Sequence, residues 1–138
     1  MPTLDALRTS RSATANQISD AVAVDRLTEL LVVRDRDDAW WRSLVLRVQE
    51  LGLAIQAHET APEVWCPASR TASTLRSAAR LRDEHAALLG EVAQLRTLID
   101  GARAEPHGYS LVLAGCTEVI AMVAGHGRRA REAAAQQF

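Results

Sequence analysis

Apolar residues recur every three or four positions along four stretches of the chain, and the pattern is clearest between residues 70 and 100. There they form two interleaved series whose members stand seven residues apart. The first series is Ala78, His85, Val92 and Ile99, and the second is Leu81, Leu88 and Leu95. This spacing places them on one face of a helix, so we predict a helix over 70–100 that faces a core. One core position is a histidine, and a buried imidazole needs a hydrogen-bond partner or a ligand.

The same periodicity predicts three further helices. The first follows a capping-box sequence at residues 14–17 and ends near Val33, and the second lies between the charged connector 34–38 and Pro62. The last helix runs over about 109–136. We expect the connector aspartates to cap the helix after them, because a carboxylate accepts hydrogen bonds from the free N–H groups at a helix start.

Two segments between these helices are also expected to adopt specific local structures. Residues 63–67 are expected to form a short helical turn, and Gly101 is expected to end the 70–100 helix as a left-handed cap. No stretch alternates apolar and polar residues as a strand does. The sequence therefore predicts an all-α single domain over 1–138, an up-down-up-down antiparallel four-helix bundle, with 1–13 as a flexible arm or an extra helical turn.

Three of the four histidines fall on the core faces of three different helices. His58, His85 and His126 each continue a seven-residue apolar series, whereas His107 lies in the loop before the last helix and is expected to be exposed. A core histidine is commonly satisfied by a backbone or hydroxyl group, and each one taken singly fits that interpretation. Imidazoles from facing helices also hold transition metals inside bundles. Three together favour the metal-site interpretation.

The charge balance and the two cysteines argue against several classes of function. All 16 basic residues are arginines, 17 residues are acidic, and the formal net charge is −1. This balance argues against a nucleic-acid or membrane partner, and the absence of lysine excludes lysine-based covalent catalysis. Cys66 and Cys116 show no C-x-x-C spacing and no apolar signal core precedes them, so we expect reduced thiols in a cytoplasmic protein. Cys116 is interpreted as a small apolar core residue.

Two sequence motifs resemble the haemerythrin-like family of cation-binding domains. The first is AHE followed by a tryptophan and Cys-Pro, within LRVQELGLAIQAHETAPEVWCP at 46–67, and the second is RDEHAALL at 82–89. With the helix that carries His126, the resemblance covers about residues 20–130. It implies a four-helix domain that holds non-haem iron and binds or senses O2, NO or iron. It also implies that His58, His85 and His126 are the histidine ligands of helices two, three and four.

At several positions the chain departs from the family's ligand pattern. Asp25 stands in place of a first-helix histidine, Pro62 and Leu89 stand where ligands are expected after two of the histidines, and arginines follow His126. Two irons need bridging carboxylates to offset their mutual repulsion. We therefore predict at most one metal ion per chain. The predicted ligands are His58, His85 and His126, with Asp25 or Glu63 as the anionic ligand.

Three functions remain open at this point. The chain is a metal-binding protein with a small diatomic ligand, a small metal-dependent oxidase, or a metal-free bundle that acts as a structural or interaction module. In the last case, apolar surface at Trp40 and Trp41 would meet a partner or a second copy in a homodimer. Asp83 and Glu84 are interpreted as solvated, and Arg129 with its neighbours as facing the negative end of its helix.

Overall fold

The computed structural model describes residues 18–57 and 71–135, which form four helices and, within these two ranges, no strand. The helices are α2 (Asp20–Leu31), α3 (Asp38–Ala57), α5 (Ala72–Ala102) and α6 (Gly108–Ala135). The predicted all-α class and the existence of the four helices are thereby confirmed. The predicted turn at 63–67, the capping box at 14–17 and the arm at 1–13 lie outside the described residues.

Short polar side chains start three of the helices. Ser19 accepts a hydrogen bond from the Val22 N–H at 3.2 Å, and Thr71 accepts one from the Thr74 N–H at 3.2 Å. The Oδ1 atom of Asp37 accepts one from the Trp40 N–H at 2.9 Å, so the expected capping by a connector aspartate is confirmed. Each of these bonds satisfies a donor that the helix itself leaves free, and each is worth about 1 kcal/mol.

The end of α5 differs from the prediction. The helix continues through Gly101 to Ala102, and no glycine in the described ranges has a positive φ, so Gly101 is not a left-handed cap. The chain instead turns within 103–107, where the Glu105 N–H bonds to the Ala102 carbonyl at 3.0 Å and the Gly108 N–H bonds to the Glu105 carbonyl at 3.1 Å. Gly108 lies so close to Ala102 that a Cβ atom would collide with the Ala102 carbonyl. Close approach, and not backbone handedness, is what requires a glycine at this turn.

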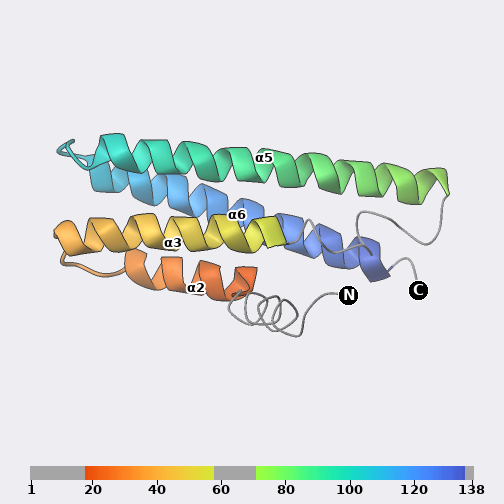
Figure 1. Cartoon of the computed structure of the whole chain (residues 1–138), viewed down its shortest axis with the longest axis horizontal. Helices are drawn as coiled ribbons and strands as arrows, with labels where there is room; N and C mark the ends of the chain where they lie inside the picture. The colour runs from red at the N-terminus through yellow and green to blue at the C-terminus, as the bar shows by residue number, and fades with distance from the viewer. Residues whose placement is uncertain (1–17, 58–70, 136–138) are drawn as a thin grey trace, which may run out of the picture.

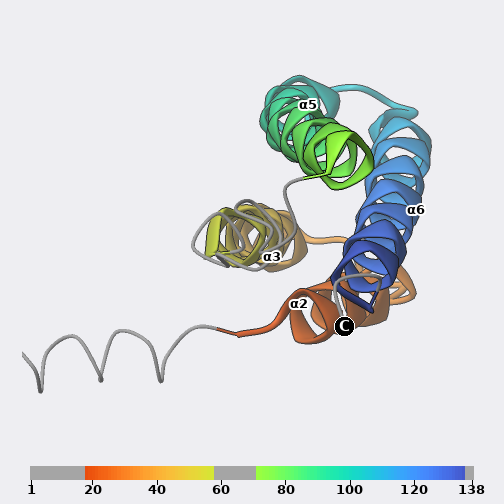
Figure 2. The same cartoon turned by 90° about the vertical axis from the view of Figure 1, so that its right-hand side faces the viewer.

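The helices lie lengthwise beside one another (Figure 1). Contacts join α2 to α3, α3 to α5, α5 to α6 and α2 to α6, and the end-on view shows the four helices around a common centre (Figure 2). Connectors 32–37 and 103–107 lie at the same end of the molecule, on the left in Figure 1. With 12 residues, α2 is much shorter than α5, which has 31, so α2 covers only part of the length of the longer helices.

The core follows the predicted apolar series closely. In α5 the buried residues are Ala78, Leu81, His85, Leu88, Val92, Leu95, Ile99 and Ala102. From Leu88 onward they share one core with fully buried leucines of the shorter helices, among them Leu27 of α2 and Leu44 and Leu51 of α3. Burial of each such leucine stabilises the fold by about 1.5–3 kcal/mol relative to leaving it in water. Hydrophobic burial of matching helix faces therefore accounts for the assembly.

The prediction that Trp40 and Trp41 form an exposed apolar surface is wrong for Trp40. That side chain is only 3% exposed, donates its Nε1–H to the Leu30 carbonyl at 2.9 Å, and contacts Trp41 edge-to-face with ring centroids 5.1 Å apart. A tryptophan on the core face of α3 can bury its ring because its one polar atom finds a carbonyl. The exposed large apolar side chains of α3 are Leu46 and Leu53, at 58% and 66%.

Candidate functional site

The interface of α5 and α6 holds two buried histidines. His85 is 2% exposed and His126 is 4% exposed, and they are the buried polar side chains of the described residues. Their ring centroids lie 5.8 Å apart with the ring planes inclined at 47°. The predicted burial is therefore confirmed for both, and His107 is exposed in the 103–107 turn as expected. The structure brings together two of the five predicted site residues.

Glu84 extends this pair across the helix interface. Its Oε2 atom lies 3.1 Å from Nδ1 of His126, and its carboxylate also contacts Nε of Arg129, 2.8 Å from Oε1 and 3.0 Å from Oε2. The side chain of Glu84 is 23% exposed, and that of Arg129 is 44% exposed. A line of polar contacts thus runs from the buried imidazole through a carboxylate to a guanidinium at the surface.

The interpretation of Glu84 as a solvated carboxylate is wrong, and Arg129 has a partner that the sequence analysis did not predict. Both partners of Glu84 lie on α6, more than 40 residues away in the sequence, which is why spacing within α5 could not reveal them. One feature of the sequence does indicate that Glu84 can contact another helix. Glu84 is adjacent to His85 and stands three residues after Leu81, so it flanks the core face and can reach across to a neighbouring helix.

Electrostatics keep the Glu84 carboxyl ionised. Partial burial acts to raise its pKa, but the hydrogen bonds from His126 and Arg129 and the charge of Arg129 together act more strongly, so the pKa lies below its ordinary value. An ionised carboxylate accepts hydrogen bonds only, so Nδ1 of His126 must carry the proton that it shares with Glu84. When His126 is neutral, Nε2 is then left as a lone-pair donor.

This arrangement fits a metal-binding histidine. Histidines that bind metals usually donate their other ring N–H to a carboxylate, which fixes the tautomer and the ring orientation. Two imidazoles that bind one ion at about 2.0–2.1 Å have ring centroids roughly 5–6 Å apart, and the centroids of His85 and His126 are 5.8 Å apart. The spacing of the two rings is therefore compatible with one shared ion.

The remaining predicted ligands do not complete a site in the described part of the chain. Asp25 is exposed on α2, whereas His58 and Glu63 belong to the segment 58–70, outside the described residues. Across 18–57 and 71–135, no three histidine, cysteine, aspartate or glutamate side chains come together as a metal-binding group. His85 and His126 are the two candidate ligands that the structure brings together, and Glu84 hydrogen-bonds to one of them.

Two other features of α6 concern its cysteine and its apolar composition. Cys116 is fully buried, and burial raises the pKa of its thiol to about 12, so it is an apolar core residue as expected and not a reactive thiolate. By length and composition α6 would be able to cross a membrane, with 28% of its most apolar window buried, but the core helix of a soluble protein meets the same criteria.

Comparison with known proteins adds no further constraint on the site: no family model, curated protein or solved structure matches the chain.

Proposed function

We propose that this protein is a metal-binding four-helix bundle that holds one transition-metal ion at His85 and His126. The observation that carries the proposal is the pair of buried imidazoles, one of which is oriented by Glu84. The Glu84 carboxylate satisfies Nδ1 of His126, which leaves Nε2 of that ring for a ligand.

We infer that the bundle has the up-down-up-down topology. Between α5 and α6, Ala102 lies by Gly108, Leu95 lies by Gly115, and His85 lies by His126, so sequence numbers rise along one helix as they fall along the other. The same relation supports opposite directions for α3 and α5, because Gly52 lies against Val92 and Gln49 lies against Arg96. Antiparallel neighbours joined by short connectors are typical of such bundles.

The proposal takes the other ligands from the segment that follows α3. Gln49 of α3 contacts Arg96 of α5, and Gly52, about one turn later in α3, contacts Val92. Later residues of α3 therefore lie beside earlier residues of α5, in the direction of His85. His58 directly follows Ala57, the last described residue of α3, and Glu63 lies five residues further on. Of the two predicted anionic ligands, Glu63 is favoured, because Asp25 is exposed on α2.

The chemistry of these ligands selects the kind of metal. Imidazole nitrogens with one carboxylate suit Fe(II) or Zn(II), and a bridged pair of irons would need further carboxylates. A Zn(II) ion held by four protein ligands has no open position, whereas an Fe(II) ion held by three or four can also bind a small ligand. We therefore favour Fe(II) and a role in binding or sensing O2 or NO, in the cytoplasm. The protein's own contribution is to exclude water and to hold His126 in one tautomer through Glu84.

Thermal unfolding with and without metal tests this proposal. A ligand that binds only the folded state at 100 times its Kd stabilises that state by about 2.7 kcal/mol, or roughly 5–10 °C for a chain of this size. We expect that shift with Zn(II) in the unmodified protein. In His85→Leu we expect no shift, and equal or higher stability without metal.

The matched control is His107→Leu, which removes an exposed histidine from the 103–107 turn and should keep the full metal-dependent shift. Equal shifts in the unmodified protein and in His85→Leu would reject the proposal.

A metal-free interaction module is the second candidate. It is favoured by the lack of a complete group of three ligands in the described ranges and by two exposed leucines of α3, Leu46 and Leu53, one heptad apart. Heptad-spaced leucines on a helix surface are typical of a face that packs against another helix. Absence of any Zn(II)-dependent shift, together with concentration-dependent self-association, would favour this function.

A further inference from the structure

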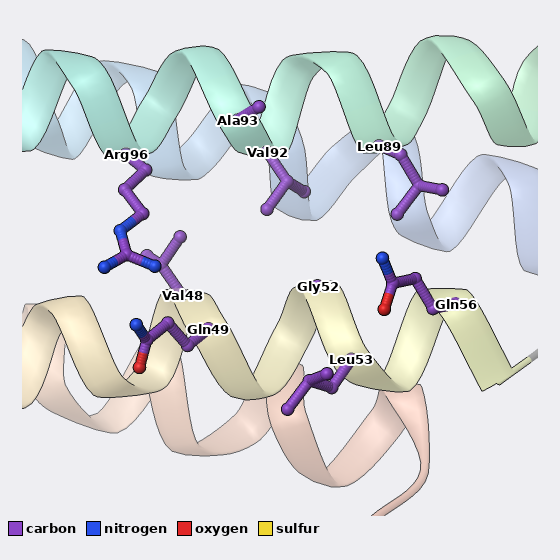
Figure 3. A pocket seen from close by; sticks show the side chains of 9 residues that line it. All are labelled: Val48, Gln49, Gly52, Leu53, Gln56, Leu89, Val92, Ala93 and Arg96. Atoms are coloured by element: carbon purple, nitrogen blue, oxygen red, sulfur yellow. The ribbon is translucent and has the colours of Figure 1, made fainter.

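A groove of about 470 Å³ lies along the α3–α5 contact, and neither buried histidine lines it. Its lining residues are Val48, Gln49, Gly52, Leu53, Gln56, Leu89, Val92, Ala93 and Arg96. In Figure 3, Arg96, Val92 and Leu89 of α5 extend toward α3, whereas Leu53 points away from α5. The volume falls within the range of about 300–1,000 Å³ that small-molecule sites occupy.

The floor of the groove is apolar because of one glycine and two valines. Val48 and Val92 are buried, and Gly52 between them contributes no side chain. A Cβ atom at Gly52 would meet the Cγ1 atom of Val92 at 3.4 Å, an ordinary contact, so helix packing alone does not require a glycine there. A glycine inside a helix costs about 1 kcal/mol relative to alanine. Its presence leaves the floor open for an occupant.

One end of the groove is polar and cationic. Arg96 reaches from α5 toward Gln49 of α3 (Figure 3), and with the Gln49 amide oxygen turned toward it, that oxygen accepts hydrogen bonds from both terminal nitrogens, at 2.9 and 2.6 Å. Arg96 has no carboxylate partner among the residues that the structure describes. A guanidinium has five donors in a fork that matches a carboxylate, so further donors remain available there.

We propose that this groove binds a medium-chain fatty carboxylate, with the alkyl chain along the floor and the carboxylate at Arg96 and Gln49. The floor spans eight residue steps from Val48 to Gln56, about 12 Å of helix axis, which suits an extended chain of that class. Leu89 adds apolar surface beside the chain, and Arg96 supplies the charge complementary to the carboxylate. The site is independent of the proposed metal.

Titration of the full chain with sodium decanoate, followed by backbone amide NMR shifts, tests the proposal. We expect saturable binding of one decanoate per chain, with the largest shifts at the groove residues. Arg96→Gln should weaken binding about three- to five-fold, because ion pairs at an exposed site are worth at most about 1 kcal/mol. Decyltrimethylammonium, which has the same chain and the opposite charge, should bind more weakly than decanoate.

Gly52→Leu should abolish binding by filling the floor. If that variant does not fold, Gly52→Ala, whose methyl group fits, should weaken binding. The matched controls are Gly90→Leu and Arg82→Gln, both on the exposed side of α5 and outside the groove, and neither should change decanoate affinity.

Three results would overturn the proposal. The first is equal binding of decyltrimethylammonium and decanoate. The second is unchanged decanoate affinity in both Arg96→Gln and the folded Gly52 variant. The third is a sedimentation experiment without decanoate in which the chain is a dimer that the Gly52 variant dissociates, because the groove is then covered by a second copy.

Discussion

Glu84 shows how one residue acquires its role from a neighbouring helix. Its carboxylate contacts His126 and Arg129. Through these contacts Glu84 orients the His126 ring, and Arg129 balances the charge of the carboxylate. Because the carboxylate is only 23% exposed, losing its partners would leave a partly desolvated charge.

The first prediction concerns acid stability of the metal-free protein. The folded pKa of Glu84 lies below the ordinary value of 4.5, so its stabilising contribution is complete above that pH and is lost as pH falls through the folded pKa. Glu84→Gln should lower the free energy of unfolding by about 1 kcal/mol at pH 7. The difference in the free energy of unfolding between this variant and the unmodified protein should become smaller at acidic pH, because Glu84 is then protonated. Urea unfolding at a series of pH values measures it.

Asp83→Asn is the control, since Asp83 is an exposed neighbour on the same helix turn. A deficit for Glu84→Gln that is the same at pH 7 and at acidic pH would show that the carboxylate charge plays no part.

A second residue-scale prediction concerns Cys116. Because its side chain is fully buried and its thiol pKa is about 12, iodoacetamide at pH 8 should leave Cys116 unmodified in the folded protein and should modify it in denaturant. Mass spectrometry of the peptide that carries Cys116 gives the readout. Equal alkylation rates in the two conditions would mean that the α5–α6 interface is open in solution.

At the scale of the element, the strength and the limit of helix periodicity both appear in α5. The seven-residue series predicts its buried face, including His85, because a 31-residue helix packed on one side must repeat its apolar residues. Periodicity does not predict the end of the helix. Gly101 looked like a terminating residue, yet the turn is decided by the tight contact of Gly108 with the Ala102 carbonyl, a feature of tertiary packing.

Alanine substitutions at two glycines test this account of the turn. Gly108→Ala should destabilise the protein by about 1–3 kcal/mol, because its Cβ collides with the Ala102 carbonyl and the turn must shift. Gly90→Ala is the matched change within α5, where nothing lies within 4 Å of the added atom, and it should stabilise by about 0.5–1 kcal/mol. Thermal unfolding of both variants checks the prediction. Stabilisation by Gly108→Ala would show that the contact is not close in solution.

For the whole molecule, the all-α class and the core faces follow from the sequence because both rest on local periodicity. The candidate site follows only in part. The burial of His85 and His126 follows from the helix face on which each lies. The distance between the two rings and the contact of Glu84 with His126 depend on how α5 and α6 are aligned, and the sequence of one helix does not determine that alignment. The burial of Trp40 was missed for a similar reason, since its Nε1–H finds its acceptor on α2.

Metal titration of the untagged chain tests the central claim most directly. Protein prepared with chelator and then titrated with Co(II), whose visible absorption reports coordination, should take up one ion per chain. His85→Leu and His126→Leu should each abolish uptake, whereas His107→Leu should retain it. Uptake should weaken as pH falls through roughly 6–7, where imidazoles begin to hold protons that compete with the metal. Binding that survives loss of both buried histidines, or no binding by the unmodified chain, would contradict a metal site between α5 and α6.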